Sequence, residues 1–227
     1  MPKDVSLSPS PRKAFADRRR DPVTKREAVL KIAAQLFLEK SYSRMSMNDV
    51  ADRLNITKPA LYHYFNNKED ILLECYRLGV GLIEGTLNEI ADHCGTGLQK
   101  VEAFIQSYAT VMTVNFGRCV MRLDEGDLSS DARAEVRTYK RKIDRRLRSF
   151  IQEGIEDGSI AACDTKITAF SIAGALTWIC MWYEPEGALS PAEIAAQFAR
   201  TLTQGLVAKT RSYKKRSSKL SIVSKGE

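Results

Sequence analysis

A succession of capped segments, in which apolar residues recur every three or four positions, constrains the fold of this chain more than any other feature. The first segment opens with a Thr-x-x-Glu capping box at Thr24 and ends near Lys40. Its apolar positions are Val29, Ile32, Ala33, Leu36 and Phe37. This spacing makes one apolar helix face, whereas no segment alternates apolar and polar residues for long enough to predict a strand. The sequence therefore predicts an all-α fold.

Two short helices follow the first one. Ser46, in a second capping box, opens a helix that ends near Asn55. Thr57 is the expected cap of a third helix, in which Leu61 and Phe65 form the buried i, i+4 pair. Two short helices joined by a tight turn form a helix-turn-helix, a unit that places its second helix in the major groove of DNA.

Apolar residues at helical spacing predict helices in the rest of the chain as well. They cover residues 67–82, 98–115, 118–123, 131–157, 165–183 and 191–209. We divide the chain into a flexible basic arm (1–22), a three-helix helix-turn-helix DNA-binding domain (23–70), an α-helical effector-binding and dimerisation domain (71–209) and a basic disordered tail (210–227).

Positive charge lies in the N-terminal third and in the two tails. The formal net charge of the chain is +7. Residues 1–22 carry six basic and three acidic side chains, residues 23–70 carry eight and six, and residues 209–227 carry seven and one, so the part between is net acidic. This asymmetry fits an N-terminal surface for a polyanion, although basic tails can also serve solubility alone.

Several classes of function find no support in the sequence. The five cysteines lie far apart and only two histidines accompany them, so neither a disulfide framework nor a metal site is expected. No nucleophile with a partnering base, P-loop or dinucleotide fingerprint is visible, so we expect no enzyme and no cofactor. There is no apolar signal segment, and polar residues interrupt the apolar stretch 167–183. We therefore expect a cytoplasmic protein without a membrane span.

The third helix offers side chains that suit DNA. With Leu61 and Phe65 pointing inward, its outer positions supply hydrogen-bond donors, aromatic hydroxyls for phosphates and a small apolar contact for a thymine methyl group. Lys68 adds positive charge at the start of the fourth helix, where free N–H groups also suit a phosphate. The predicted DNA-contacting residues are Ser46, Thr57, Lys58, Ala60, Tyr62, His63, Tyr64 and Lys68.

Residues 28–71 closely resemble the DNA-binding domain of the TetR family of bacterial transcriptional regulators. The resemblance runs through Ala33-Ala34, Phe37, Tyr42, Ser46, Val50-Ala51, Leu61-Tyr62, Tyr64-Phe65 and Lys68-Glu69. The chain departs from the family pattern at Ser41, where glycine usually ends the first helix, at Met45, where threonine is common, and at Pro59, where a small residue is frequent. None of these departures removes a charge or a hydroxyl expected at DNA.

The resemblance implies a homodimeric repressor that binds a palindromic double-stranded DNA operator and is released by a small-molecule effector. The family usually dimerises through a four-helix bundle of its last two long helices, which correspond here to residues 165–183 and 191–209. The residues expected at the dimer interface are Ala169, Ala173, Leu176, Cys180, Ile194, Phe198, Leu202 and Leu206, which recur at helical spacing.

In this family the effector cavity usually lies in the core of the C-terminal domain. The residues expected to line it are Tyr108, Met112, Phe116, Arg118, Arg122, Tyr139, Ile143 and Trp178. Residues 137–148 carry seven basic side chains, which suit the phosphates of a coenzyme A thioester whose acyl chain enters the apolar helices. Residues 178–198 look like family members that control lipid, sterol or aromatic-acid catabolism through acyl-CoA ligands.

Two alternatives stay open at this stage. A repressor that responds to a hydrophobic or cationic drug would place acidic side chains in its cavity, and the candidates are Asp124, Glu125 and Asp127. A helical interaction module would use the same helices without binding DNA, because helix pairs occur in every all-α fold.

Overall fold

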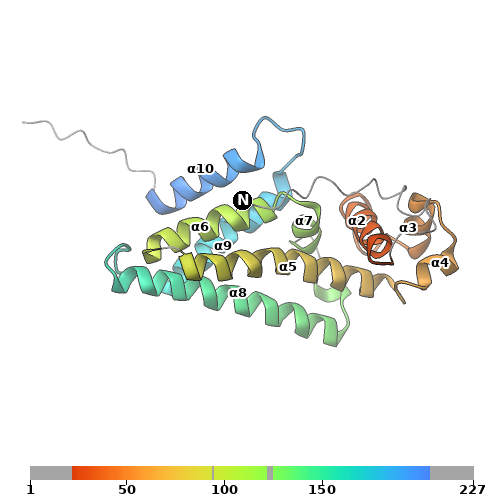
Figure 1. Cartoon of the computed structure of the whole chain (residues 1–227), viewed down its shortest axis with the longest axis horizontal. Coiled ribbons are helices and arrows are strands. Elements are labelled where there is room, and N and C mark those ends of the chain that lie inside the picture. Colours follow the sequence, from red (N-terminus) through yellow and green to blue (C-terminus); the bar gives the residue numbers. More distant parts are fainter. Residues whose placement is uncertain (1–21, 94, 122–124, 205–227) are drawn as a thin grey trace, which may run out of the picture.

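The computed structural model describes residues 22–93, 95–121 and 125–204, and all regular structure in these ranges is helical (Figure 1). The elements are α2 (Pro22–Lys40), α3 (Met47–Leu54), α4 (Lys58–Tyr62), α5 (Lys68–His93), α6 (Gly97–Val111), α7 (Asn115–Met121), a 3-10 turn η2 (Glu125–Asp127), α8 (Ser130–Glu156), α9 (Thr165–Trp182) and α10 (Pro191–Gln204). The all-α prediction is confirmed.

The helices form an elongated molecule with a small head at one end (Figure 1). The head consists of α2, α3 and α4, and α5 leaves it to run along the molecule beside α8. At the other end α6 packs against α8, α9 and α10. Because α7 contacts both α2 and α5, the head is held to the remainder by packing as well as by the continuous α5 helix.

Several predicted helix starts are confirmed. Ser46 forms the N-cap of α3 in a complete capping box. The side-chain oxygen of Asn67 accepts a hydrogen bond from the backbone N–H of Asp70 at 2.8 Å, and Ser190 accepts one from Glu193 at 3.3 Å. The capping box at Thr24 is wrong, because α2 already begins at Pro22, a residue that the first turn of a helix tolerates.

The predicted helix over residues 98–115 is divided in the structure. α6 starts at a capping box between Thr96 and Gln99, which the sequence analysis missed, and ends before Met112. The Thr113 hydroxyl then donates to the backbone carbonyl of Thr110 at 2.7 Å, closing a turn that leads into α7. Gly117 lies against the Val111 carbonyl, where an added Cβ would overlap the backbone, so this bend requires a glycine.

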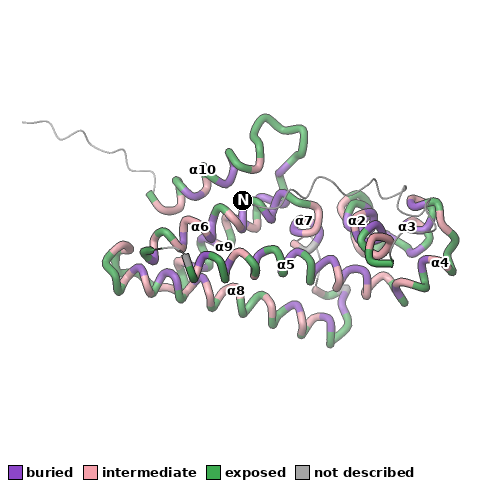
Figure 2. The backbone as a smooth tube through the Cα atoms, in the orientation of Figure 1, coloured by how far each residue is buried: buried purple, intermediate pink, exposed green. Residues whose placement is uncertain are grey.

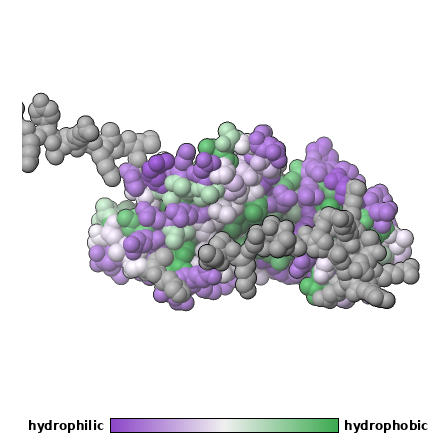
Figure 3. All heavy atoms as spheres, turned by 45° about the horizontal axis from the view of Figure 1, so that its top comes forward, coloured by the Kyte–Doolittle hydropathy of each residue, from purple (hydrophilic) through white to green (hydrophobic). Residues whose placement is uncertain are grey.

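Two hydrophobic clusters form the core, and α5 passes through both. The first fills the head around Leu61 and Phe65 and extends to Cys119 of α7 and Val136 of α8. The second joins the inner faces of α6, α9 and α10 with the far halves of α5 and α8. Buried stretches follow these inner faces in Figure 2, while the face seen in Figure 3 is mainly hydrophilic with small hydrophobic patches. The predicted domain boundary at residue 70 therefore falls within one helix, and packing crosses it.

Some predictions lie outside the described residues. They are the basic arm, except for Pro22, the basic tail (210–227), Arg122 and Leu206. Within the described ranges, no helix has the length and apolar character needed to cross a membrane, and no group of His, Cys, Asp and Glu side chains is arranged to hold a metal ion.

Candidate DNA interface and effector cavity

The turn between α3 and α4 is fixed by hydrogen bonds. At the other end of α3, before the helix begins, the Ser46 N–H donates to the Asp49 carboxylate at 2.8 Å, and the Asp49 N–H donates to the Ser46 hydroxyl at 3.3 Å. α3 ends at Asn55, which has a left-handed backbone with φ of 56°. The Ile56 N–H donates to the Ala51 carbonyl at 3.0 Å. Asparagine adopts this backbone more readily than most residues, so the turn holds α4 at a defined angle to α3.

α4 is shorter than the predicted helix, which was expected to reach Phe65. It ends at Tyr62, and Thr57 occupies its N-cap position without a capping hydrogen bond from its side chain. The chain then turns, because Asn67 must leave the helical conformation in order to cap α5. Leu61 and Phe65 are nevertheless buried as predicted.

The predicted DNA-contacting residues differ in exposure. Ser46, Thr57, Lys58, Tyr62 and His63 are exposed, whereas Ala60, Tyr64 and Lys68 are half-buried. The Lys58 ammonium lies 5.9 Å from the centroid of the Tyr62 ring, one turn further along α4. α4 thus presents an ammonium and a phenol hydroxyl side by side. The sequence analysis expects the donor to contact bases and the aromatic hydroxyl to contact phosphates.

Two of the predicted DNA contacts are engaged within the protein. Tyr64 packs against the first hydrophobic cluster, and its carbonyl accepts a hydrogen bond from Arg26 Nη1 at 3.0 Å. The Lys68 ammonium donates to the carbonyls of Tyr42 and Ser43 at 3.2 and 3.4 Å and lies 4.5 Å from the centroid of the Tyr42 ring. Lys68 therefore ties α5 to the loop between α2 and α3, and its predicted contact with a phosphate stays a prediction.

A cavity of about 500 Å³ lies between α5, α6, α7, α8 and α9. Its wall is mostly apolar, with the Tyr108 hydroxyl as one buried polar group. Burial, together with the nearby Cys180, raises the pKa of Tyr108 to about 12. The lining residues Lys140, Phe170, Trp178 and Met181 are exposed, so the mouth of the cavity lies between α8 and α9.

Half of the predicted effector residues line this cavity. They are Tyr108, Met112, Ile143 and Trp178. Sequence analysis missed other lining residues, including Tyr76, Phe104 and Thr177. The apolar stripe of α5 continues through Tyr76, so helical periodicity could have indicated that this side chain faces inward.

Three of the predicted effector residues do not line the cavity. Phe116 belongs to α7 and packs against the first hydrophobic cluster, because the chain turns after Met112. Arg118 donates to the backbone carbonyl of Tyr183 at 3.0 Å. Tyr139 packs against Tyr76, with ring centroids 5.9 Å apart. The structure therefore does not bring these three side chains to the cavity.

The basic face of α8 contains both paired and unpaired side chains. Glu125 lies 3.2 Å from Arg137 Nε and 2.7 Å from Lys140 Nζ. It is therefore a partner of α8 and not an acidic cavity residue. Asp124 and the side chain of Asp127 lie outside the described residues. Arg141 and Arg145 are exposed, and they donate to backbone carbonyls of the preceding turn at 3.2 and 3.3 Å. Neither arginine has a carboxylate partner in the described part of the chain.

The face of α9 predicted for dimerisation is the inner one. Ala169, Leu176 and Cys180 are at most 1% exposed within a single chain, and Ile194 of α10 is 2% exposed. Ala173 lines the cavity, and Phe198 and Leu202 pack against the second cluster. Ala169, Leu176, Cys180 and Ile194 have almost no surface left for a partner, whereas Ala173, Phe198 and Leu202 are half-buried, so the interface assignment stays a prediction. The exposed large apolar side chains of α9 are Ile167, Phe170, Trp178, Met181 and Trp182. Because this helix is apolar all round, its sequence pattern could not distinguish the inner face from the outer one.

Comparisons with known proteins agree with this architecture. Residues 29–75 match the family model described as bacterial regulatory proteins, tetR family, and residues 94–206 match the tetracyclin repressor-like C-terminal domain. The HTH-type transcriptional repressor KstR2 of Mycolicibacterium smegmatis is 24% identical over 188 residues, which cover 82% of this chain and 92% of the relative.

Solved structures share the fold along most of the chain. The TetR family regulator PfmR from Thermus thermophilus has 25% sequence identity and a TM-score of 0.73, covering 79% of this chain and 99% of its own. AibR, solved in complex with isovaleryl coenzyme A and operator DNA, has 25% identity and a TM-score of 0.69, covering 78% and 97%. With family matches to both its head and its C-terminal domain, the chain belongs to the TetR family of DNA-binding bacterial transcriptional regulators.

Proposed function

We propose that this regulator is a homodimeric repressor that leaves its operator when an acyl-CoA thioester binds. The observation that carries the proposal is the cavity, which combines an apolar wall with a buried hydroxyl and a mouth beside the basic face of α8. Its volume of about 500 Å³ and its few polar groups are typical of small-molecule sites.

Each part of such a ligand finds a suitable group. The acyl chain occupies the apolar interior, and the Tyr108 hydroxyl donates a hydrogen bond to the thioester carbonyl. Arg141 and Arg145 on the outer face of α8 bind the phosphates of the coenzyme, because a guanidinium pairs with two phosphate oxygens at once. The named activities of two similar proteins support this choice, since KstR2 is a repressor and AibR was solved with isovaleryl coenzyme A.

The charges at the mouth favour a thioester over a cationic drug. Asp144 is the acidic residue among those that line the cavity, and its carboxylate lies 2.7 Å from Arg148 Nη2. Lys140 lines the same mouth. A bound cation would therefore meet no unpaired carboxylate among the lining residues, because Asp144 is already paired with Arg148.

Titration of coenzyme A thioesters into an operator complex tests the effector. An operator duplex is selected from a random library, and isovaleryl-CoA, palmitoyl-CoA and free coenzyme A are added to its complex with the protein. We expect a thioester to release DNA and to raise the melting temperature of the free protein, with free coenzyme A much weaker. If no thioester displaces DNA or shifts the melting temperature, acyl-CoA is not the effector.

Two variants locate the site. Ala173→Trp fills the cavity from α9 and is expected to keep operator affinity while abolishing the response to thioesters. The double variant Arg141→Ala, Arg145→Ala leaves the cavity intact. It is expected to lower the affinity for coenzyme A thioesters at least about tenfold, since two charge-assisted contacts are lost. An unchanged response in both variants would place the ligand elsewhere.

The exposed face of α9 is the proposed dimer surface. Ile167, Trp178 and Trp182 are 66%, 64% and 43% exposed, and Gly174 lies between Ile167 and Trp178 with open space where a Cβ would stand. Trp178 also borders the mouth of the cavity, so this surface lies next to the entrance. Apolar side chains gathered on one helix face are typical of an interface, and small residues allow helices to approach closely. A second copy of the same helix supplies a matching apolar face, as a two-fold axis requires.

Ile167→Glu tests this surface with little risk to folding, because a glutamate in the first turn of a helix is favourable. We expect the variant to sediment as a monomer at micromolar concentration, while Leu189→Glu in the α9–α10 loop, where the side chain is also exposed, leaves the dimer intact. A monomeric wild type, or a dimeric Ile167→Glu variant, would contradict the assignment.

A further inference from the structure

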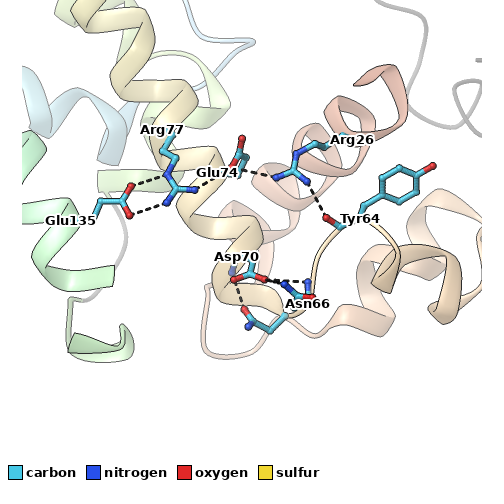
Figure 4. A network of polar contacts seen from close by, with 8 residues as sticks. Arg26, Tyr64, Asn66, Asp70, Glu74, Arg77 and Glu135 are labelled. Atoms are coloured by element: carbon cyan, nitrogen blue, oxygen red, sulfur yellow. Dashed lines mark hydrogen bonds and ion pairs between the residues drawn. The ribbon is translucent and has the colours of Figure 1, made fainter. Parts of the chain in front are cut away.

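A chain of polar contacts joins the head to α8 (Figure 4). Arg26 on α2 donates to the Tyr64 carbonyl at 3.0 Å, and its Nη2 lies 3.4 Å from Glu74 Oε2 on α5. Arg77 donates to the same Glu74 oxygen from Nη1 at 3.3 Å. From its other side Arg77 reaches Glu135 of α8. In Figure 4 the Tyr64 ring points away from these contacts, so only its backbone takes part.

The pair between Arg77 and Glu135 is the best-oriented contact of the chain. Nε and Nη2 of Arg77 donate to the two carboxylate oxygens of Glu135 at 2.7 and 2.9 Å. Hydrogen bonds from Arg77 and, more weakly, from the Tyr139 hydroxyl lower the pKa of Glu135. Both side chains of the pair are partly exposed, so it contributes little to stability. A two-pronged contact does, however, fix the angle between α5 and α8.

The other end of the chain of contacts reaches the cavity. Tyr139, one turn after Glu135 on α8, packs against Tyr76 with ring centroids 5.9 Å apart. The Tyr76 hydroxyl donates to the backbone carbonyl of Val136 at 3.5 Å. Because Tyr76 also lines the cavity, the turn of α8 that holds Glu135 is in direct contact with the cavity wall.

A second tie holds the start of α8 to the start of α5. The Ser129 N–H donates to the Glu69 carboxylate at 2.7 Å, and Glu69 is two residues into α5, directly after the turn that follows α4. In that turn Asn66 donates to the Asp70 carboxylate from its backbone and its side chain, at 3.1 and 2.9 Å. The start of α8 is therefore held to the first turns of α5 at two points, by Ser129 at Glu69 and by Glu135 at Arg77.

We propose that Arg26 and Arg77 are positioning residues for DNA reading: through Glu74 and Glu135 they set the orientation of the turn at Tyr64, and with it α4, relative to α8. Neither arginine needs to touch DNA. As a corollary that rests on the proposed function, an effector that shifts α8 at the cavity changes the orientation of α4 through these same contacts.

The chain offers a matched control. Lys142 Nζ lies 2.7 Å from Glu84 Oε1, so this pair joins the same two helices as Arg77 and Glu135 but stands farther from the head. Glu84 and Glu135 have similar side-chain exposure, 27% and 29%. Glu135→Gln and Glu84→Gln therefore each remove one carboxylate charge from the α5–α8 contact, and only the first interrupts the path to Tyr64.

Hydrogen exchange of the full-length protein without any ligand tests the positioning role. In Glu135→Gln we expect the backbone of residues 62–67 to exchange at least about threefold faster, because the turn loses its support, while Glu84→Gln exchanges like the wild type. Arg77→Met serves as a second interruption with a good helix former. Wild-type exchange at residues 62–67 in both interrupting variants, or an equal rise in the control, would overturn the proposal.

A second measurement separates positioning from stability. Glu135→Gln is expected to lower the ratio of operator to random-duplex affinity about fivefold with a nearly unchanged melting temperature, and Glu84→Gln to leave the ratio within a factor of two. Isovaleryl-CoA is then added to each operator complex. Release of DNA from the wild type but not from Glu135→Gln, with equal thioester affinity of the free proteins, supports the corollary. No release from any protein counts against the acyl-CoA effector, and the exchange and affinity results then decide the positioning role alone.

Discussion

The head and the effector domain are built from similar helices but pack them differently. Val29, Val50 and Leu61 of the head are completely buried, each enclosed by neighbouring side chains of one cluster. In the effector domain Leu147, Met112 and Phe104 are equally inaccessible, yet they line a cavity of about 500 Å³. A close-packed core resists small changes of shape, whereas a wall that faces empty space can move at little cost. This regulator therefore keeps its DNA-reading geometry rigid and leaves room for change where a ligand can enter.

Removing the same kind of side chain from each core tests this difference in packing most strongly. Leu61→Ala and Leu147→Ala both delete a leucine that is at most 1% exposed. Leu61→Ala is expected to lower the free energy of unfolding by about 2–5 kcal/mol, because the tightly packed head cannot collapse onto the void. Leu147→Ala should cost clearly less, since part of that side chain already borders a cavity. Urea unfolding followed by circular dichroism gives both values.

An equal or larger loss for Leu147→Ala would mean that the cavity wall is as well packed as the head. A cavity ligand gives an independent check. Leu147→Ala should alter its affinity, whereas Leu61→Ala, in the other cluster, should leave the affinity of the folded protein unchanged.

Base reading by α4 is expected to have the next largest effect. Lys58→Ala removes an exposed ammonium from the surface of the head, so it should weaken operator binding by about 1–3 kcal/mol if Lys58 contacts a guanine. Fluorescence anisotropy with operator and random duplexes at the same salt concentration measures the loss. Equal losses on the two duplexes would show that Lys58 contacts phosphate only and carries no sequence information.

The two regions also differ in how much the sequence could predict. In the head the signals are local: Ser46 and Asn67 cap helices by accepting hydrogen bonds from the backbone a few residues away, and the buried residues of α3 share a single face. In the effector domain contacts depend on which of two apolar faces turns inward. On α9 the periodicity does not distinguish Leu176, which is buried, from Trp178, which is exposed. The cavity itself is a property of how five helices pack, and no local pattern encodes it.

The contacts within the head that the sequence did not predict have the same origin. Lys68 carries the charge expected at DNA, but the Tyr42 ring and two carbonyls from a loop 25 residues earlier in the chain surround its ammonium. Arg26 gave no local signal, although it supports the reading turn through the Tyr64 carbonyl. Both contacts join residues that are distant in sequence, so propensity and spacing could not reveal them.

The head should also be sensitive to acid, because the Asp49 carboxylate takes part in the capping box at the start of α3. Hydrogen bonds from the Lys40 side chain and then from Ser46 lower its pKa to about 2, from about 3.8 in the unfolded chain. A carboxyl whose pKa is depressed in the folded state stabilises it at neutral pH, and this contribution is lost as the pH falls from about 4 to 2. Asp49→Asn should therefore cost about 1 kcal/mol at pH 7, after allowance for solvent screening, and close to nothing at pH 2. Unfolding curves at both pH values measure the difference, and a cost that does not change with pH would contradict the role of the charge.

The smallest expected effect concerns the one strained residue at the end of α2. Ser41 has a backbone φ of 65°, a left-handed conformation in which the side chain is unfavourable, and this is the position where the family usually has glycine. Ser41→Gly relieves that strain but adds conformational freedom to the unfolded chain, so the net gain in stability should stay below about 1 kcal/mol. Asn55→Gly is the matched control, because Asn55 has a φ of 56° and asparagine already tolerates it. We expect the melting temperature to rise for Ser41→Gly and to change less for Asn55→Gly. If both variants melt below the wild type, the side chains at these helix ends contribute more than their backbone strain costs, and the rigidity of the head depends on these polar contacts as well as on its buried core.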